Sequence, residues 1–93
     1  MEDELMVLIQ KAAKLLKSMG ATDVFLFGSA AKGEYRKGSD IDLAVSGLPP
    51  EKYYYAVGEM MTVLRHPVDL IDLDVKNEFT EYLSTHGELH HVG

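Results

Sequence analysis

The fold of this chain is decided by two runs of sequence, Val24-Phe25-Leu26-Phe27-Gly28-Ser29 and Ser39-Asp40-Ile41-Asp42-Leu43-Ala44-Val45. The first is a short apolar run that ends in glycine, which is typical of a strand covered on both faces. The second begins by alternating carboxylates with aliphatic residues, which is the two-residue period of a strand. We therefore expect strands over 24–27 and 40–45.

The carboxylates of the second run form a candidate metal site. Side chains two residues apart on a strand point to the same face, so Asp40 and Asp42 are expected to project together. Like charges at this spacing make each other harder to ionise, and a hard cation with a preference for oxygen ligands relieves that penalty. The pair therefore predicts a Mg²⁺ site.

The end of the first run is a candidate phosphate site. A strand that ends in Gly28-Ser29 and opens a helical turn presents free backbone N–H groups, which commonly hold phosphate. The segment after it carries Lys32, Arg36 and Lys37, and is net positive. A positive loop beside a carboxylate pair indicates a metal-bridged polyphosphate site.

Length and composition place residues 1–93 in one globular domain. The chain is 46% hydrophobic and 26% charged, as globular proteins are. It has no cysteine, which excludes disulfides, thiolate nucleophiles and cysteine-based zinc sites. Its net charge of −6 argues against a non-specific nucleic-acid binder, because such proteins need a basic surface.

Two further features bear on location. No apolar stretch approaches the roughly 18 residues that a membrane span requires. The acidic start Met1-Glu2-Asp3-Glu4 is unlike a secretory signal peptide. We expect a cytoplasmic protein with no membrane contact.

The remaining residues predict helices and one more strand. The periodicity predicts helices over 2–19, 51–65 and 75–85, a third strand over 68–73, and a tail over 88–93 that adds an edge strand or frays. Asp74 is expected to cap the last helix, with Phe79, Tyr82 and Leu83 turned inward and Gly87 as its stop. This order predicts an α/β fold, a small sheet with helices packed on it.

Two alternative motifs are excluded. Gly28 to Gly33 has the glycine spacing of a Walker A loop, but Glu34-Tyr35 stands where that loop needs lysine and serine or threonine. The Asp40-x-Asp42 pattern also opens a calcium-binding EF-hand loop, but Ala44 replaces its next oxygen ligand.

Together with Val68-Asp69-Leu70, these runs resemble the signature of the minimal nucleotidyltransferases (MNT proteins) of the DNA polymerase β-like superfamily. That signature is an apolar strand, Gly-Ser, about a dozen residues, Asp-hydrophobic-Asp, and a third acid on a later strand. The resemblance implies a nucleotidyltransferase (polymerase β palm-like) fold, in which a small mixed β-sheet has flanking helices. It also implies Mg²⁺-dependent nucleotidyl transfer and a HEPN partner in a toxin–antitoxin module.

The resemblance assigns roles to individual residues. It makes Asp40, Asp42 and Asp69 the catalytic carboxylates and ligands of two Mg²⁺ ions, and it makes Gly28, Ser29, Lys32 and Ser39 the nucleotide-binding residues. The third acid stays open, because Asp72 lies three residues after Asp69 and faces the other side of the strand; the family pattern favours Asp69. Many relatives carry arginine directly after Gly-Ser, where this chain has Ala30.

Three functions follow from this interpretation. The first is a protein adenylyltransferase, an enzyme that transfers a nucleoside monophosphate from an NTP to a hydroxyl of a HEPN partner toxin. We expect the NTP to be ATP. By modifying the toxin, the enzyme would act as an antitoxin. The short chain leaves no room for a separate acceptor-binding domain, which favours an acceptor with its own surface. The alternative is a non-catalytic nucleotide-binding antitoxin that neutralises its partner by contact alone. The third, a homodimer with a purely structural role, has no sequence feature behind it.

Other conspicuous side chains have ordinary interpretations. Tyr53, Tyr54 and Tyr55 cannot all enter one core, because consecutive helical positions point about 100° apart, and an exposed tyrosine suits a partner contact. Met60 and Met61 are expected to fill the core. His86, His90 and His91 are expected at the surface.

Overall fold

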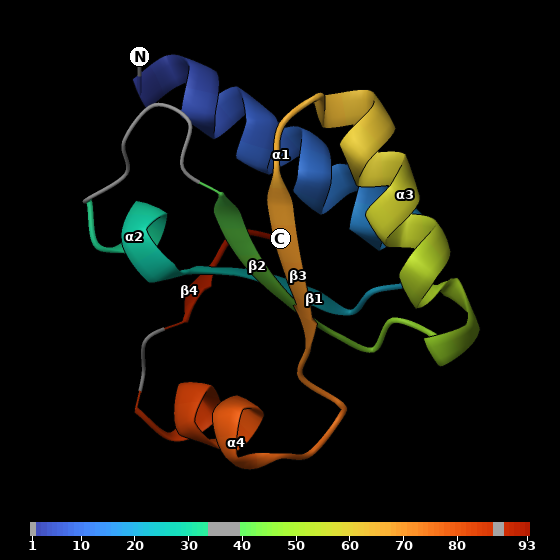
Figure 1. Ribbon diagram of the computed structural model, residues 1–93, viewed down its shortest axis with the longest axis vertical. Coiled ribbons are helices and arrows are strands. Elements are labelled where there is room, and N and C mark those ends of the chain that lie inside the picture. Colours follow the sequence, from blue (N-terminus) through green and yellow to red (C-terminus); the bar gives the residue numbers. More distant parts are fainter. Residues whose placement is uncertain (1, 34–39, 87–88) are drawn as a thin grey trace.

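A four-stranded mixed sheet lies at the centre of the fold (Figure 1). The computed structural model describes residues 2–33, 40–86 and 89–93. The strands are β1 (Asp23–Phe27), β2 (Ile41–Ser46), β3 (Val68–Asp72) and β4 (His90–His91), in the order β3-β2-β1-β4. β1 pairs antiparallel with β2 and β4, and β2 pairs parallel with β3. The predicted small mixed sheet is confirmed, and the tail does add an edge strand.

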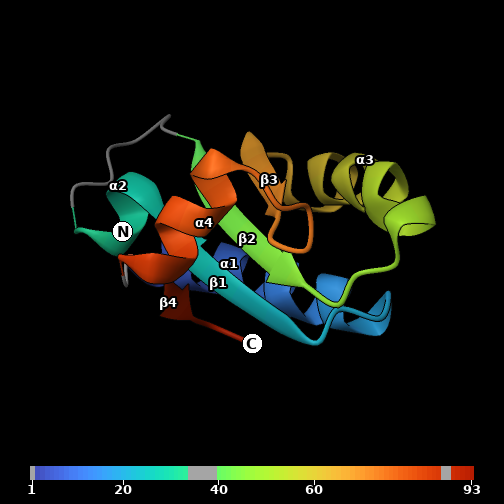
Figure 2. The same cartoon turned by 90° about the horizontal axis from the view of Figure 1, so that it is seen from below.

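Helices cover both faces of this sheet. They are α1 (Glu2–Ser18), α2 (Gly28–Ala31), α3 (Tyr53–Leu64) and α4 (Glu78–Thr85), with a 3-10 turn over Pro50–Lys52 before α3. α1 and α3 lie on one side of the sheet and α4 on the other (Figures 1 and 2). No helix within the described ranges is both long enough and apolar enough to cross a bilayer.

The alternation in β2 decides which side chains face which helices. Ile41, Leu43 and Val45 are buried in the larger core with α1 and α3. Ala44 belongs to the smaller core, which Phe27, Leu73 and Leu83 complete on the α4 side. Asp42 is two residues before Ala44 and therefore projects on the α4 side as well.

The three predicted helices form, and α3 ends within one residue of its predicted end at Arg65. α3 stops at Leu64, because Arg65 adopts the left-handed conformation (φ 51°) and its N–H donates to Met61 O at 3.2 Å. Met60 is buried, as predicted, whereas the prediction for Met61 is wrong because its side chain is exposed. Tyr54 and Tyr55 are exposed, so the predicted failure of the three tyrosines to enter one core is confirmed.

The prediction for α4 needs two corrections. Its cap is Asn77, not Asp74: Asn77 Oδ1 accepts from Thr80 N–H at 2.9 Å, and Thr80 Oγ1 accepts from Asn77 N–H at 3.0 Å. Asp74 instead accepts from Gly47 N–H at 2.7 Å. Gly87, the predicted stop, lies outside the described residues.

The buried face of α4 also differs from the prediction. Thr80 and Leu83 are buried, whereas Phe79 and Tyr82 are half exposed. This two-turn helix covers only a narrow strip of the sheet, so a single stripe of side chains fits beneath it. Thr80 can be buried because its hydroxyl donates to Val75 O at 2.7 Å, which satisfies the polar group.

We expect Asn77→Ala to lower the free energy of unfolding by about 1 kcal/mol, because the first turn of α4 loses its side-chain acceptor. Urea denaturation followed by circular dichroism measures this loss. An Asn77→Ala variant as stable as the unmodified chain would contradict the assignment of the cap.

Candidate active site

Three neighbouring strands bring two acids into one row with the turn at Gly28-Ser29, which we call the glycine elbow. Phe27, the last residue of β1, pairs with Asp42 of β2, and Asp42 pairs with Asp69 of β3. Paired residues on adjacent strands lie about 5 Å apart and point to the same face. Gly28, which follows Phe27, therefore lies in one row with Asp42 and Asp69 on the α4 side of the sheet. We call this row the acidic row.

The electrostatics show that the acids influence one another. Burial raises the pKa of the Asp42 carboxyl above its usual value, and the negative charges of Asp69 and then Asp40 raise it further. Asp40 and Asp69 are exposed, whereas Asp42 is partly covered. The sequence predicts this repulsion between carboxylates, and a cation bound between them would relieve it.

Gly28 lies directly against the Asp42 carboxylate. It has a φ of +75°, and a Cβ placed on it would lie 2.2 Å from Asp42 Oδ2. Its backbone conformation favours glycine, and the carboxylate occupies the space that any side chain would fill. The elbow after β1 and the central acid therefore touch.

Of the other predicted nucleotide-binding residues, two are described by the structure and follow Gly28 closely in the chain. Ser29 belongs to the short helix α2 that Gly28 begins. Lys32 follows α2, its side chain is exposed, and its N–H donates to Gly28 O at 3.2 Å. Ser39, like Arg36 and Lys37, lies outside the described residues.

The register separates the two candidates for the third acid. Asp69 pairs with Asp42, whereas Asp72 pairs with Val45 farther along β2. Asp72 Oδ1 accepts from Asp74 N–H at 2.9 Å and so helps to form the turn after β3. Asp69 is therefore the residue that lies beside Asp42, and its role as a metal ligand stays a prediction.

The donor set fits Mg²⁺ better than it fits a closed protein cage. In the described part of the chain, no three histidine, aspartate or glutamate side chains converge tightly enough to hold a metal by themselves. Mg²⁺ usually takes only one or two protein carboxylates and completes its shell with waters and substrate phosphates. Adjacent carboxylates beside the predicted phosphate site at Gly28 match that requirement.

Residues 10–89 match the family model described as polymerase beta nucleotidyltransferase. The chain belongs to the polymerase β nucleotidyltransferase family. The match spans most of the chain, so the family and fold that the resemblance implies are confirmed. No curated protein sequence matches this nucleotidyltransferase domain.

Solved structures share the fold. A toxin–antitoxin with AMP-PNP is 24% identical with a TM-score of 0.68, and the match covers 95% of this chain and 70% of that one. A structure described as a minimal nucleotidyltransferase is 22% identical with a TM-score of 0.74, covering 98% and 93%. A tri-AMPylated Shewanella oneidensis HEPN toxin in complex with MNT antitoxin is 22% identical with a TM-score of 0.65, covering 91% and 68%.

Two aromatic residues of this nucleotidyltransferase domain join the site without having been predicted there. Tyr53 donates its hydroxyl to Leu70 O on the outer edge of β3. Burial raises the pKa of the Tyr53 phenol, and Asp69, Tyr54 and Asp72 raise it further. Phe79 packs edge-on against Phe27 with ring centroids 6.1 Å apart. The sequence signals neither contact, because both depend on where α3 and α4 pack.

A pocket of about 350 Å³ opens between the start of α3, the end of β3 and the start of α4. We call it the α3–α4 pocket, and its lining includes Tyr53, Tyr54, Ile71, Asp72, Val75 and Phe79. Ile71 follows Asp69 by two residues on the same strand. The pocket therefore begins about 7 Å along β3 from Asp69, which does not itself line it.

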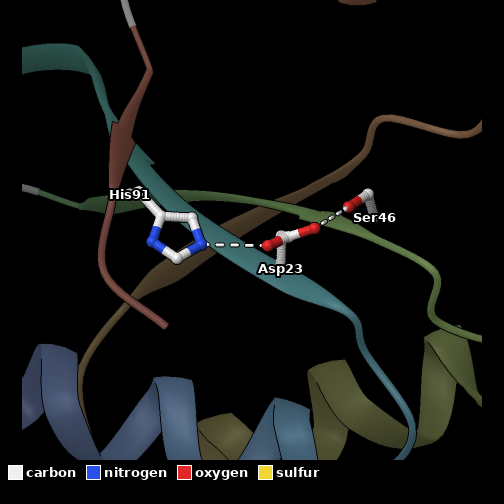
Figure 3. Close-up of polar contacts among 3 residues, drawn as sticks. All are labelled: Asp23, Ser46 and His91. Carbon is white, nitrogen blue, oxygen red and sulfur yellow. Dashed lines mark hydrogen bonds and ion pairs between the residues drawn. The ribbon is translucent and has the colours of Figure 1, made fainter.

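A second polar cluster of the nucleotidyltransferase lies at the opposite end of β1 (Figure 3). His91 Nε2 lies 2.9 Å from Asp23 Oδ1, and Ser46 Oγ donates to Asp23 Oδ2 at 3.4 Å. The carboxylate stands between hydroxyl and imidazole, whereas a nucleophilic triad places the imidazole in the middle. This cluster is therefore not a nucleophilic triad, and its contacts join β4 and β2 to β1. His86, His90 and His91 are all exposed, as predicted.

Proposed function

We propose that this nucleotidyltransferase is Mg²⁺-dependent, transfers AMP from ATP to a hydroxyl of a HEPN-type partner protein, and thereby acts as an antitoxin. The observation that carries the proposal is the row from Gly28 through Asp42 to Asp69. In this row Gly28, which we propose to bind phosphate, lies against the carboxylate of Asp42, and the charges of Asp69 and Asp40 repel that carboxylate. A metal-bound triphosphate would supply phosphate groups for the glycine elbow and positive charge for the carboxylates.

The residues of the row and their neighbours have two roles in the proposed reaction, phosphate binding and metal binding. Gly28 and Ser29 hold the outer phosphates through backbone N–H groups, with Lys32 beside them. Asp40, Asp42 and Asp69 would hold two Mg²⁺ ions, which supply charge stabilisation for the attacking and leaving oxygens.

The group transfer balances as an in-line displacement. The acceptor hydroxyl oxygen forms a bond to the α-phosphorus, and the bond from that phosphorus to the bridging oxygen of pyrophosphate breaks. The hydroxyl proton passes to a carboxylate oxygen of Asp69. The products are an AMP ester of the acceptor and pyrophosphate.

The partner is proposed from the structural neighbours. One of them is an AMPylated HEPN toxin in complex with an MNT antitoxin, and another is a toxin–antitoxin with AMP-PNP. Identity with these chains is 22–24%, so they support the fold directly and the partner only by analogy.

The proposal is tested by following the label of ATP. We expect α-labelled ATP to label a purified HEPN-type partner in the presence of Mg²⁺, γ-labelled ATP to leave it unlabelled, and EDTA to prevent labelling. Calorimetry is expected to detect ATP binding that Mg²⁺ strengthens. Label from γ-labelled ATP would indicate phosphorylation instead, and the absence of both binding and label would reject the enzyme.

A second function is favoured by the exposed face of α3. Tyr54, Tyr55 and Met61 are exposed there, which suits neutralisation of a partner by contact alone. An Asp40→Asn/Asp42→Asn double variant separates the two functions. Loss of inhibition with retained partner binding supports catalysis, whereas undiminished inhibition supports contact alone.

A further inference from the structure

The α3–α4 pocket lies on the side of the acidic row that faces away from the glycine elbow. The sheet order places β1, β2 and β3 side by side, so Gly28, Asp42 and Asp69 follow one another across it. Ile71 faces the same side of β3 as Asp69, at about 7 Å along the strand. Tyr53 lies close enough to Asp69 for that charge to raise its phenol pKa.

The in-line geometry of the reaction indicates that the acceptor lies on the β3 side of the acidic row. In an in-line displacement the attacking oxygen approaches the phosphorus opposite the leaving group. If Gly28 and Ser29 hold the phosphates that leave, the acceptor must approach from the β3 side, beyond Asp69. The α3–α4 pocket begins two residues along β3 from Asp69, at Ile71 and Asp72, within reach of the side chain next to a hydroxyl bound at that position.

The lining restricts the chemistry of the occupant. Ile71, Val75 and the rings of Tyr54 and Phe79 supply apolar surface. Asp72 belongs to the lining and Asp69 lies close by, so an anionic group such as a phosphate would be repelled. The volume of about 350 Å³ is at the small end of ligand pockets, which suits a single large side chain.

We propose that the α3–α4 pocket receives a large apolar or aromatic side chain of the acceptor protein and thereby positions the adjoining hydroxyl at the acidic row. This inference rests on the proposed function and adds to it a substrate-binding surface. Tyr54 and Val75 are then residues that determine acceptor specificity. Because they bind the acceptor equally before and during transfer, their loss raises the KM for the acceptor and leaves kcat unchanged.

The test uses a double variant of the pocket and a matched double variant outside it. Tyr54→Ala/Val75→Ala removes two pocket side chains that are 84% and 55% exposed. Tyr82→Ala/Val7→Ala removes the same residue types, 49% and 49% exposed, that neither line the pocket nor belong to the exposed face of α3. All four side chains are about half exposed or more, so both variants should fold, and thermal melting checks this.

The readout is initial-rate labelling of a HEPN-type partner by α-labelled ATP, with partner and ATP varied separately. We expect the pocket variant to raise the KM for the partner about tenfold, as removal of interface anchors does, with the KM for ATP and kcat unchanged. The matched variant should behave as the unmodified chain.

Three results would overturn the inference. Equal partner KM values in the two double variants would show that the pocket does not bind the acceptor. A raised KM for ATP in the pocket variant would place the nucleoside there instead. Both results leave transfer by the unmodified chain intact, so they reject the pocket alone, whereas absence of transfer by the unmodified chain rejects the proposed function and the pocket with it.

Discussion

Asp42→Asn is expected to reduce nucleotidyl transfer by a factor on the order of 100–1000 or more, as loss of one preorganised electrostatic group does. Asp42 is the central member of the row, paired with Asp69 and in contact with Gly28. An asparagine keeps the shape of the side chain but removes the charge that a cation needs. Labelling of the partner by α-labelled ATP measures the loss.

The same variant is expected to be more stable than the unmodified chain when no nucleotide or metal is bound. The pKa of Asp42 is raised in the folded chain, so its ionised form is less favourable there than in the unfolded chain. Asparagine removes that cost, and because solvent screens the partly exposed carboxylate, the gain is on the order of 0.2–1 kcal/mol. For a domain of this size, each 1 kcal/mol corresponds to about 4–8 °C in Tm.

The pH dependence of this gain identifies its cause. The usual pKa of the carboxyl is 3.8, and the folded value lies above it. Below pH 3.8 the carboxyl is protonated in both states, so the gain of Asp42→Asn should vanish there. It should grow as the pH rises through the folded pKa and then remain constant. Thermal melts across this pH range measure it.

Asp23→Asn is the matched control for both effects. It makes the same change at the opposite end of β1, where Asp23 binds Ser46 and His91. We expect it to leave transfer unchanged. Retained transfer by Asp42→Asn would show that Asp42 is not a ligand of the cation. A Tm below that of the unmodified chain would show that Asp42 is not under electrostatic strain.

The strands of the site could be predicted because local sequence determines them. The run ending in Phe27 and the alternation that begins at Asp40 each specify a strand, and the alternation places Asp42 opposite Leu43 whatever the rest of the chain does. The pairing of Asp42 with Asp69 has no such local signal. It depends on the parallel register between β2 and β3, which the crossover through α3 fixes.

The side chains that surround the row could not be predicted, for a related reason. The tyrosines of α3 are equivalent in the sequence, and only the position of the helix at the edge of β3 gives Tyr53 its bond to Leu70. Phe79 fits the apolar stripe of α4 as well as Leu83 does. The narrow strip of sheet beneath α4 buries Leu83 and leaves Phe79 at the margin, where it lines the α3–α4 pocket.

Gly28→Ala is expected to lower transfer by about 100-fold, because a displacement of a catalytic group by about 1 Å can cost that much. The new Cβ would lie 2.2 Å from Asp42 Oδ2, so the carboxylate has to move. The alanine must also adopt a φ of +75°, a strain on the order of 1–3 kcal/mol. Labelling kinetics measure the first effect and urea denaturation the second.

Gly33→Ala separates displacement from strain. Gly33 has a φ of +74°, almost the same as that of Gly28, but a Cβ placed on it meets no atom within 4 Å. Both variants should therefore lose stability through the backbone, while only Gly28→Ala should lose transfer. If the two variants lost transfer equally, the contact between Gly28 and Asp42 would have no part in catalysis, and the requirement for glycine after β1 would be one of backbone conformation alone.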